Sequence, residues 1–557
     1  MRIASLFGLL AAVAFFGVPA PARAQDESRP TEPIIVNDEL VFPPGVPRYL
    51  TETERKWLAS HPQVQTRSVT PPPTGPIHCA AEYEPMDAIV MTWKSYPTIQ
   101  QQMGAAITTT GNADLYLNVD NTSVQASAAS ALSGAGANMS RVHYFTRITD
   151  TVWCRDYGPR YIFEGDCRAL VDHVYNRPRP NDDIEPFYFA AFKHQAYYQH
   201  QLTHGGGNMH LDAFNHAFVT RLVDNENPSL SETQIHDIWQ TYQNIDTHFF
   251  DPFPTSIDST QHIDMWVQIV GDHKVMVSDW PNNPGSTQDN ICDGAAAYFT
   301  SQGYTVYRLP AFSVSGTHYT YTNVVICNNL LLLPTYTNST VSPSNATAQA
   351  TYQSALPGYT VTPINCQQII TAAGAMHCIA SHMPKHRGAR GDFGGLAPTA
   401  YLKNLRGGDV LPPGNPVNIQ WISDDDVGTV NADILLSTDG GLNYDVTIAA
   451  ATADDWTQSW TPPNIYAPHC RIKIVARDGV GNTGSDSSPA DFTINGAPVP
   501  GDVTCDAHVT LADVDPFVQA LLDPTSFSGC NLSAADVNGD TLIDGNDVAP
   551  FVQAVAP

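Results

Sequence analysis

Four short stretches of the sequence bring together residue types that catalyse reactions and that an apolar core excludes. They read WCRDYGP from Trp153, HGGGNMH from His204, QHIDMW from Gln261 and AMHCIASHMP from Ala375. The last contains Cys378, and a cysteine becomes a nucleophile when it has thiolate character and a histidine moves protons beside it. We therefore predict a thiol-based active site built from these stretches.

The carboxylates of the same stretches indicate the charge of the substrate. Asp156 and Asp264 beside a thiolate would raise its pKa, so the site suits a reactant that carries its own positive charge. A guanidinium does so, and its planar fork of N–H donors matches two carboxylates while its central carbon stays open to attack. His262 lies two residues before Asp264, and on a strand both would face one pocket while Ile263 faces the core.

A pair of arginines could bind a negative charge. Arg177 and Arg179 lie two residues apart in the extended, proline-interrupted stretch VYNRPRPNDD. Both can therefore face one side and present two forks to an anion. The alternative is a solvated basic loop whose arginines balance the charges of Asp182 and Asp183.

The chain that positions these groups has the features of an exported protein. Residues 1–24 combine an early arginine, an apolar run and a small-residue end, Ala22-Arg23-Ala24, which is typical of a signal peptide. No later run approaches the roughly 18 apolar residues of a membrane span. We expect a protein that is secreted, periplasmic or on the cell surface. Its formal net charge of -28 argues against nucleic acid and anionic membranes as partners.

The rest of the 557 residues divides into regions that differ in composition and in the pattern of apolar residues. Residues 25–75 are rich in proline and polar residues, with one helical patch, ETERKWLASH, and are predicted to be a leader or linker. Residues 76–396 alternate short apolar strands with helical segments and glycine turns, as expected of one large catalytic α/β unit. Residues 397–495 alternate apolar and polar residues between regular turn signals, which predicts an immunoglobulin-like β-sandwich.

The last part, residues 500–557, contains a repeat with the spacing of a 12-residue calcium loop. The second copy offers a full set of oxygen ligands, one of them a backbone carbonyl at Leu542: Asp536, Asn538, Asp540, Leu542, Asp544 and Asp547. The first copy is weaker and offers Asp502, Thr504, Asp506 and Asp513. An acidic, solvated tail is the alternative. The pattern resembles the paired loops of dockerin-like modules, which implies structural calcium, a small α-helical fold and a protein partner. Cys505 and Cys530 are the pair we expect to be bridged.

Six motifs of the large unit resemble, in order, those of the guanidine-modifying penteins. They read AAEYEPMDAIVMTW, VWCRDYGPRYIF, GGGN, HIDMW, YTNVVI and HCIASHMP, and they span roughly residues 76–396. Within that family the chain is most similar to the secreted bacterial peptidylarginine deiminases, with the agmatine deiminases as the nearest relatives.

The resemblance implies an α/β fold, a five-bladed pseudosymmetric propeller with its active site at the centre. It implies hydrolytic deimination of arginine to citrulline and ammonia, with no cofactor for catalysis. Cys378 becomes the nucleophile that forms a thiouronium intermediate, and His262 the general acid and base. Asp156 and Asp264 become the clamps of the guanidinium.

The resemblance also assigns substrate contacts. Trp153 and Asn323 match residues of the family's substrate pocket. In the deiminases that this chain resembles, a pair like Arg177 and Arg179 binds the carboxylate of a C-terminal peptidyl arginine. His377 and His382 are expected to be orienting or surface groups.

Other interpretations stay open. Agmatine or free arginine could be the substrate, since Ser259 stands where the family places a substrate-contacting tyrosine. HGGGN could form the oxyanion hole of an esterase, but the chain has no G-x-S-x-G motif. His204, His210 and His262 could hold the zinc of a hydrolase, although their spacing is not that of a helix face. An inactive pentein that serves as a surface-assembly or binding protein belongs to a different class.

Overall fold

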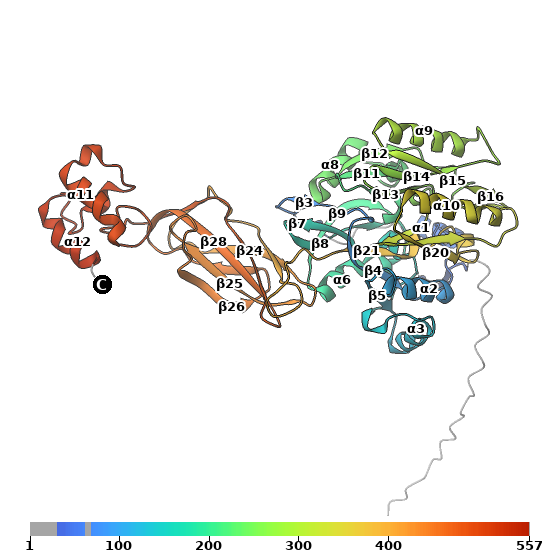
Figure 1. Cartoon of the computed structure of the whole chain (residues 1–557), viewed down its shortest axis with the longest axis horizontal. Coiled ribbons are helices and arrows are strands. Elements are labelled where there is room, and N and C mark those ends of the chain that lie inside the picture. The colour runs from blue at the N-terminus through green and yellow to red at the C-terminus, as the bar shows by residue number, and fades with distance from the viewer. Residues whose placement is uncertain (1–30, 62–67, 556–557) are drawn as a thin grey trace, which may run out of the picture.

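The structure, a computed structural model, describes residues 31–61 and 68–555. Figure 1 shows three parts in a row, which are a large α/β unit, a middle part made of strands, and a small helical part at the C-terminal end. The predicted signal peptide, residues 1–24, lies outside the described residues. Within them, no helix has the length and apolar character that crossing a membrane requires.

Five sheets of the large unit repeat one pattern, in which an antiparallel pair of strands is followed by a parallel strand. Their strands are β7 (Arg160–Glu164), β8 (Cys167–Tyr175) and β9 (Ala196–His204); β10 (His210–Leu211), β11 (His216–Thr220) and β12 (Asp246–Phe250); β13 (Val267–Gly271), β14 (Lys274–Asp279) and β15 (Thr305–Pro310); β18 (Val325–Cys327), β19 (Leu330–Thr335) and β20 (Thr360–Asn365); β21 (Ser381–Pro384), β4 (Met86–Thr92) and β5 (Asp114–Val119). Two further strands, β3 (Ile77–His78) and β6 (Val142–Thr146), extend the first and the last of these sheets.

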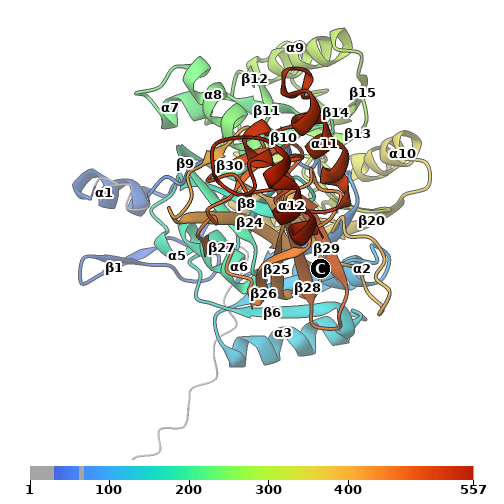
Figure 2. The ribbon, with the colours of Figure 1, turned by 90° about the vertical axis from the view of Figure 1, so that its left-hand side faces the viewer.

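A helix connects the two parallel strands of each sheet, because parallel neighbours need a long crossover. In sheet order these helices are α6 (Glu185–Lys193), α8 (Glu232–Gln243), α9 (Thr287–Ser301), α10 (Asn345–Ala355) and α2 (Pro97–Thr108). In α8, Ser231 opens the helix with a capping box, and Ile235, Trp239 and Tyr242 repeat on one buried face. Figure 2 shows α2, α8, α9 and α10 around the outside of the unit, with the strands between them.

The strands are strongly apolar because helices and neighbouring sheets cover their faces. In β19, for example, Leu330 to Leu333 have no exposed surface. The largest apolar cluster of the unit runs from these strands to Trp153 and Cys378. The predicted catalytic cysteine therefore lies inside the unit and is not on its surface.

Residues 31–61, within the stretch predicted to be a leader or linker, form defined elements that pack on the large unit. A hairpin of β1 (Ile34–Val36) and β2 (Glu39–Val41) precedes α1 (Glu52–Ser60), a helix expected from the patch ETERKWLASH. Thr51 and Glu54 start α1 with a capping box. Between the hairpin and the helix, Val46 and Arg48 are buried.

The middle part contains two sheets around one apolar core. A three-stranded sheet has the order β22-β24-β27, and a second sheet has the order β23-β30-β28-β25-β26, with β29 paired to β28. Trp421 of β24 and Ile474 of β28 contribute to the same core. This arrangement supports a sandwich, and its immunoglobulin-like character stays a prediction. The strands are β22 (Thr399–Leu402), β23 (Val410–Leu411), β24 (Val417–Asp424), β25 (Thr429–Ser437), β26 (Val446–Ala453), β27 (Thr457–Trp460), β28 (Tyr466–Asp478), β29 (Thr483–Ser487) and β30 (Phe492–Asn495).

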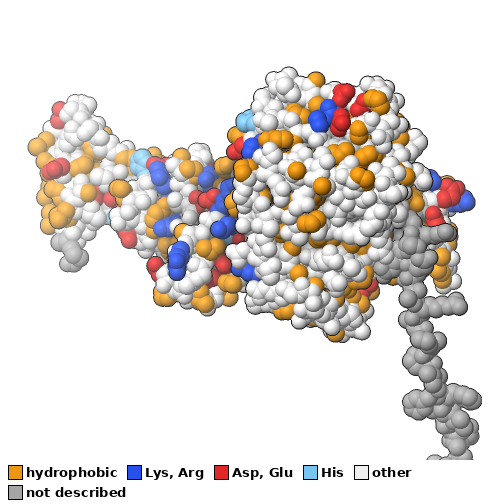
Figure 3. Space-filling view, turned by 45° about the vertical axis from the view of Figure 1, so that its right-hand side comes forward, with side chains coloured by type: hydrophobic (Ala, Val, Ile, Leu, Met, Phe, Trp, Pro, Cys, Tyr) orange, Lys and Arg blue, Asp and Glu red, His pale blue; other side chains and the backbone are white. Residues whose placement is uncertain are grey.

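A buried ion pair joins the middle part to the large unit. Arg168 of β8 donates to the carboxylate of Asp424 at 2.7 Å, and His386 contacts the same carboxylate at 3.1 Å. Burial alone would raise the pKa of Asp424, but Arg168 and His386 hold it well below its usual range. Figure 3 shows charged side chains gathered over the middle part, whereas the surface of the large unit that is turned toward the viewer has few.

The C-terminal part is a small helical module closed by a disulfide. α11 (Val514–Leu522) and α12 (Val548–Val555) pack through Phe517 and Phe551, whose rings stack at 3.8 Å. Cys505 and Cys530 form the predicted disulfide, with Cα atoms 5.8 Å apart. The dockerin-like assignment of this module stays a prediction.

Candidate active site

The chain enters each of the five repeated sheets through a short turn that carries polar side chains. These turns are α4 (Cys154–Tyr157) before β7, η2 (Gly206–Asn208) before β10, η3 (Ile263–Met265) before β13, residues 320–324 before β18, and η6 (His377–Ile379) before β21. Contacts join α4 to η2 and η6, and η2 to η3. The repeated fold therefore collects stretches that are far apart in sequence into one buried site.

The site contains a guanidinium, and it belongs to Arg48. Nε and Nη2 of Arg48 donate to the two oxygens of Asp156 at 2.8 and 2.7 Å. Nη1 and Nη2 donate to the two oxygens of Asp264 at 3.0 and 2.9 Å. Both predicted clamps thus bind the guanidinium in bidentate fashion, which is the geometry that makes such pairs strong.

The charges of this cluster stabilise one another. Burial alone would raise the pKa of Asp156, but the guanidinium of Arg48 holds it well below its usual range. For Arg48, burial would lower the pKa, and the two carboxylates raise it above its ordinary value. All three side chains have at most 1% of their surface exposed. A cation is therefore needed to balance Asp156 and Asp264.

The glycines of HGGGN shape the pocket. A Cβ on Gly207 would overlap Nη2 of Arg48, and it would lie 2.7 Å from Asp264 Oδ2 and 2.8 Å from Asp156 Oδ1. A Cβ on Gly205 would lie 2.6 Å from Cε1 of His262. The backbone N–H of Gly207 also donates to Asp156 at 3.2 Å. These residues are glycines because the guanidinium and its partners lie against the main chain.

Cys378 is held in its turn by Asn323. The Asn323 side-chain amide donates to the Cys378 sulfur at 3.2 Å, and its oxygen accepts the backbone N–H of His377 at 3.1 Å. Burial, followed by Asp264 and Asp156, raises the pKa of the Cys378 thiol, while the nearby Arg48 guanidinium opposes the rise. The thiol therefore needs a bound cation to approach its reactive thiolate form.

His262 contacts the guanidinium directly. Its Nδ1 lies 2.7 Å from Nη2 of Arg48 and 3.4 Å from Asp156 Oδ1. Its other nitrogen, Nε2, is buried and has no hydrogen-bond partner among residues 31–61 and 68–555. The strand expected around HIDMW is wrong, since Asp264 lies in the 3₁₀ turn η3. His262 and Asp264 nevertheless face one pocket, and Ile263 is in the core as expected.

His377 and His382 are not surface groups. Nδ1 of His377 contacts Asp264 Oδ2 at 3.0 Å, and its Nε2 contacts the carboxylate of Glu82 at 3.0 Å. Arg155 links Glu82 at 2.8 Å to Nδ1 of His382 at 2.7 Å. The two histidines thus belong to a buried network that orients the clamp Asp264.

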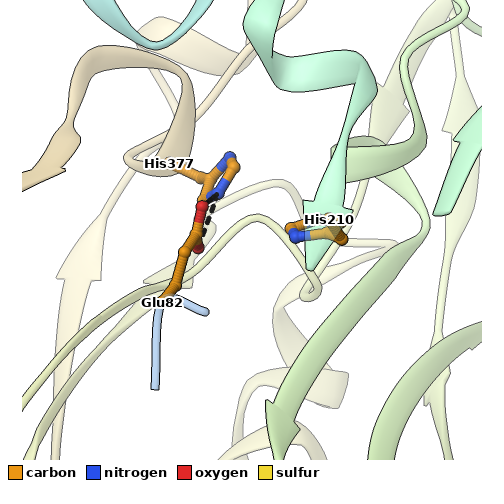
Figure 4. Close-up of side chains that lie close together, drawn as sticks. All are labelled: Glu82, His210 and His377. Atoms are coloured by element: carbon orange, nitrogen blue, oxygen red, sulfur yellow. Dashed lines mark hydrogen bonds and ion pairs between the residues drawn. The ribbon is translucent and has the colours of Figure 1, made fainter. Parts of the chain in front are cut away.

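Figure 4 shows the carboxylate of Glu82 joined to the ring of His377, with His210 beside them. One ligand atom from each lies within 4.8 Å of the others. In the described part of the chain, His210 thus groups with these two residues and not with His204 and His262, the set considered for zinc. Burial lowers the pKa of His210 to about 3, so its ring is neutral.

Three of the four predicted substrate-binding residues contact the backbone that carries Arg48, and the fourth, Asn323, contacts Cys378 instead. Nε of Arg177 donates to the carbonyl oxygen of Arg48 at 3.2 Å, and Trp153 Nε1 donates to that of Val46 at 2.8 Å. Arg179 is buried, donates to the carbonyl of Pro47 at 2.8 Å and pairs with a carboxylate of α1. The solvated-loop alternative for this arginine pair is wrong, because their exposed fractions are 7% and 0%.

The acids of the first predicted calcium loop lie together. Carboxylate oxygens of Asp502, Asp506 and Asp513 are within 4.8 Å of one another. Burial, with these two neighbours, raises the pKa of Asp502 to about 6. A divalent cation fits this donor set. In the second loop the described residues form no such group, although Asp536 accepts backbone N–H groups as Asp502 does.

Asp156, Asp264, Cys378 and His262 were predicted from the sequence and lie together in the structure, whereas Arg48 and Glu82 were not predicted. Glu82 lies in the AAEYEPMD motif, so a signal for it was present. Arg48 lies in a stretch without regular apolar periodicity, GVPRYL, and no local pattern marks it.

A buried thiol, a histidine and two guanidinium-binding carboxylates define the class of a guanidine-modifying cysteine enzyme. Residues 78–384 match the Porphyromonas-type peptidyl-arginine deiminase family, and the chain belongs to it. The chain is 24% identical over 381 residues to an agmatine deiminase of Ectopseudomonas mendocina, which covers 58% of this chain and 100% of that protein. A putative agmatine deiminase of Legionella pneumophila is 23% identical over 254 residues, 42% of this chain and 72% of that protein.

Among solved structures, similarity extends over 56% of this chain. A putative arginine deiminase of Porphyromonas gingivalis is 18% identical, with 99% of that chain covered and a TM-score of 0.48. An agmatine deiminase of C. jejuni is 16% identical, with 96% covered and a TM-score of 0.47. The family assignment makes the chain a deiminase of guanidino groups, a hydrolase of C–N bonds, and gives the large unit its α/β pentein-like fold.

Proposed function

We propose that the chain deiminates the guanidinium of peptidyl arginine to the ureido group of citrulline, with release of ammonia. The observation that carries this proposal is the Arg48 guanidinium, which lies between Asp156 and Asp264 beside Cys378. An arginine side chain within a polypeptide thus fits the pocket with every clamp engaged. The repeated sheets, whose entry turns all contribute to the site, support the expectation of a five-bladed arrangement around it.

In the first half of the reaction, the sulfur of Cys378 attacks the central guanidinium carbon of the substrate. The proton lost by the thiol passes through His262 to the departing nitrogen, which occupies the place of Nη2 of Arg48, 2.7 Å from Nδ1 of His262. The C–N bond breaks, ammonia leaves, and the carbon remains bound to sulfur as a cationic thiouronium. Asp156 and Asp264 hold the positive charge throughout.

In the second half, water attacks the same carbon. His262 takes a proton from the water and returns one to sulfur as the C–S bond breaks, so Cys378 is regenerated as a thiol. The second proton of the water is released to solvent, where it is taken up by the ammonia that left in the first half. The oxygen of the water becomes the carbonyl oxygen of the ureido product. Because this product is neutral, it is not held by the charges of the two carboxylates and dissociates.

The substrate class rests on Arg177. Its Nε lies 3.2 Å from the carbonyl oxygen of Arg48, and in a peptide that ended at the arginine this oxygen would belong to the terminal carboxylate. We therefore propose a preference for C-terminal peptidyl arginine, with free arginine as a weaker substrate. Agmatine has no carbonyl at this position, but relatives of this chain are named agmatine deiminases, so agmatine is the second candidate.

Export and tail docking complete the proposal. Residues 1–24 would direct the chain out of the cytoplasm. Calcium in the loop of Asp502, Asp506 and Asp513 would order the C-terminal module, which would then bind a protein partner.

The test measures ammonia and citrulline from four substrates: a peptide ending in arginine, the same peptide with internal arginine, free arginine and agmatine. Because Arg48 occupies the pocket, the purified chain and its Arg48→Ala variant are both assayed, each with Cys378→Ala as its control. Turnover that requires Cys378 and is fastest on the C-terminal arginine supports the proposal. Turnover of agmatine alone contradicts the substrate class. Binding without turnover in either chain favours the binding-protein alternative.

A further inference from the structure

Residues 45–54 follow the active site as a bound peptide would. The backbone N–H of Arg48 donates to the carbonyl of Ala372 at 3.0 Å, and the N–H of Gly45 donates to Ser95 at 2.8 Å. The large unit in turn donates to a run of carbonyls in this segment, at Val46, Pro47, Arg48 and Tyr49. Because these contacts are made to the main chain, they depend little on which side chains the peptide carries.

A second anchor lies at the start of α1. Glu54 is fully buried, and its carboxylate pairs with Arg179 at 2.8 Å. The same carboxylate accepts the backbone N–H of Thr51 at 2.7 Å in the capping box. Burial would raise the pKa of Glu54, but Arg179 holds it below its usual range. Folding of α1 and docking of the segment are therefore linked through one residue.

The docked segment closes the site. Cys378, His262 and Asp264 have no exposed surface, and Asp156 has 1%. The guanidinium of Arg48 uses the oxygens of both clamps and contacts His262 Nδ1. A second guanidinium cannot bind the same carboxylates while Arg48 is in place.

We propose that residues 45–54 are an intramolecular arginyl-peptide ligand of the active site, and that an external arginyl substrate binds only after this segment has left. This inference rests on the proposed function for the identity of the competing substrate. The site is then a peptide-binding groove with a guanidinium pocket at its base. In the folded chain this groove is filled by residues 45–54. Displacement or removal of the segment makes the active site accessible to substrate.

The effect should be large enough to measure. A tethered ligand has an effective concentration on the order of millimolar. If the untethered segment bound with a dissociation constant on the order of 0.1 mM, about one site in ten would be open at any time, and reactivity would rise by about tenfold when the ligand is lost.

The first experiment follows alkylation of Cys378 by iodoacetamide in the full chain, quantified by mass spectrometry of the peptide that contains it. Arg48→Ala and Glu54→Gln should each increase the alkylation rate by about tenfold. Glu52→Gln and Arg55→Ala are the matched controls, because both residues lie on α1, pair with each other and are exposed. If Arg48→Ala and Glu54→Gln react at the rate of these controls, the segment does not close the site.

The same chains are then assayed for turnover of the arginyl peptide. An increase in kcat/KM that parallels the increase in alkylation supports both the intramolecular ligand and the proposed function. Faster alkylation without turnover supports the ligand and contradicts the deiminase function. If the parent chain turns over substrate as fast as both variants, the intramolecular ligand is contradicted and the proposed function is supported.

Loss of Arg48 leaves two buried carboxylates without a cation, and the variant could fail to fold. Methylguanidinium in the buffer addresses this, since it can fill the vacated pocket. It should raise the Tm of Arg48→Ala and leave that of the parent chain unchanged. Equal shifts in both chains would show that Arg48 does not occupy the pocket in solution. The Glu54→Gln variant keeps Arg48 and tests the same proposal without this risk.

Discussion

Gly207→Ala should close the guanidinium pocket while leaving the fold intact. Gly207 does not adopt a left-handed backbone conformation, so alanine adds no backbone strain. Its Cβ would, however, overlap the position of Nη2 and lie 2.7 Å from Asp264 and 2.8 Å from Asp156. Neither carboxylate can withdraw easily, because Asp264 is bound by His377 at 3.0 Å and Asp156 by the Gly207 N–H at 3.2 Å.

The magnitude follows from the bonds that the methyl group displaces. A bound guanidinium would lose about two hydrogen bonds to charged groups, each of which contributes about 1.5–3 kcal/mol. The sum of about 3–6 kcal/mol corresponds to a decrease in kcat/KM of about 10² to 10⁴.

The assay measures kcat/KM for citrulline formation in the Arg48→Ala background, where the pocket contains no arginine of its own. Gly294→Ala is the control, since Gly294 lies on the exposed side of α9 with open space around it. Near-equal Tm values would show that both variants fold. If Gly207→Ala retained kcat/KM within about threefold of the control, the substrate guanidinium would not lie against Gly207, and the reasoning would be refuted.

Three further predictions follow from contacts elsewhere in the chain. In the Arg48→Ala background, Arg177→Ala should raise KM about tenfold or more for a C-terminal arginyl peptide and leave KM for agmatine unchanged; equal effects on both would contradict a carboxylate-binding role. Asp424→Ala should lower the free energy of unfolding by up to about 3–5 kcal/mol in urea titrations, because the buried Arg168 would lose the Asp424 carboxylate and keep, among the described residues, only Asp87 as an ionic partner. In the parent chain the pKa of Asp424 is lowered on folding, so the stability that the Arg168–Asp424 pair contributes is present above the unfolded pKa of about 4 and is lost as the pH falls below it. A free energy of unfolding that did not change with acid pH would contradict the contribution of this ion pair. In the C-terminal module, the pKa of Asp502 is raised to about 6, so without a cation the module should lose stability as the pH rises from about 4 to 6. Calcium should restore that stability in thermal scans, and chelator should leave deiminase activity unchanged; activity lost with chelator would indicate metal in the active site.

The chemistry of the site could be predicted from short motifs, because residue type and local spacing determine it. Cys378, His262, Asp156 and Asp264 each lie in a stretch whose polar residues have no place in an apolar core. The expected strand around His262 was wrong for a local reason. A 3₁₀ turn and a strand can both direct residues two apart into one pocket, so spacing alone does not distinguish them.

What fills and orients the site was decided by the tertiary structure. Arg48 lies 108 residues from Asp156 and 216 from Asp264, and Glu82 lies 295 residues from His377. No local pattern encodes contacts over such distances, since they arise only when the entry turns of the five sheets meet. The sequence by itself determined a thiol, a proton carrier and two carboxylates suited to a guanidinium. Only the packing of residues 31–61 on that centre decided that the guanidinium in it belongs to the chain itself, because two buried carboxylates require a cation and Arg48 is the one that the fold brings to them.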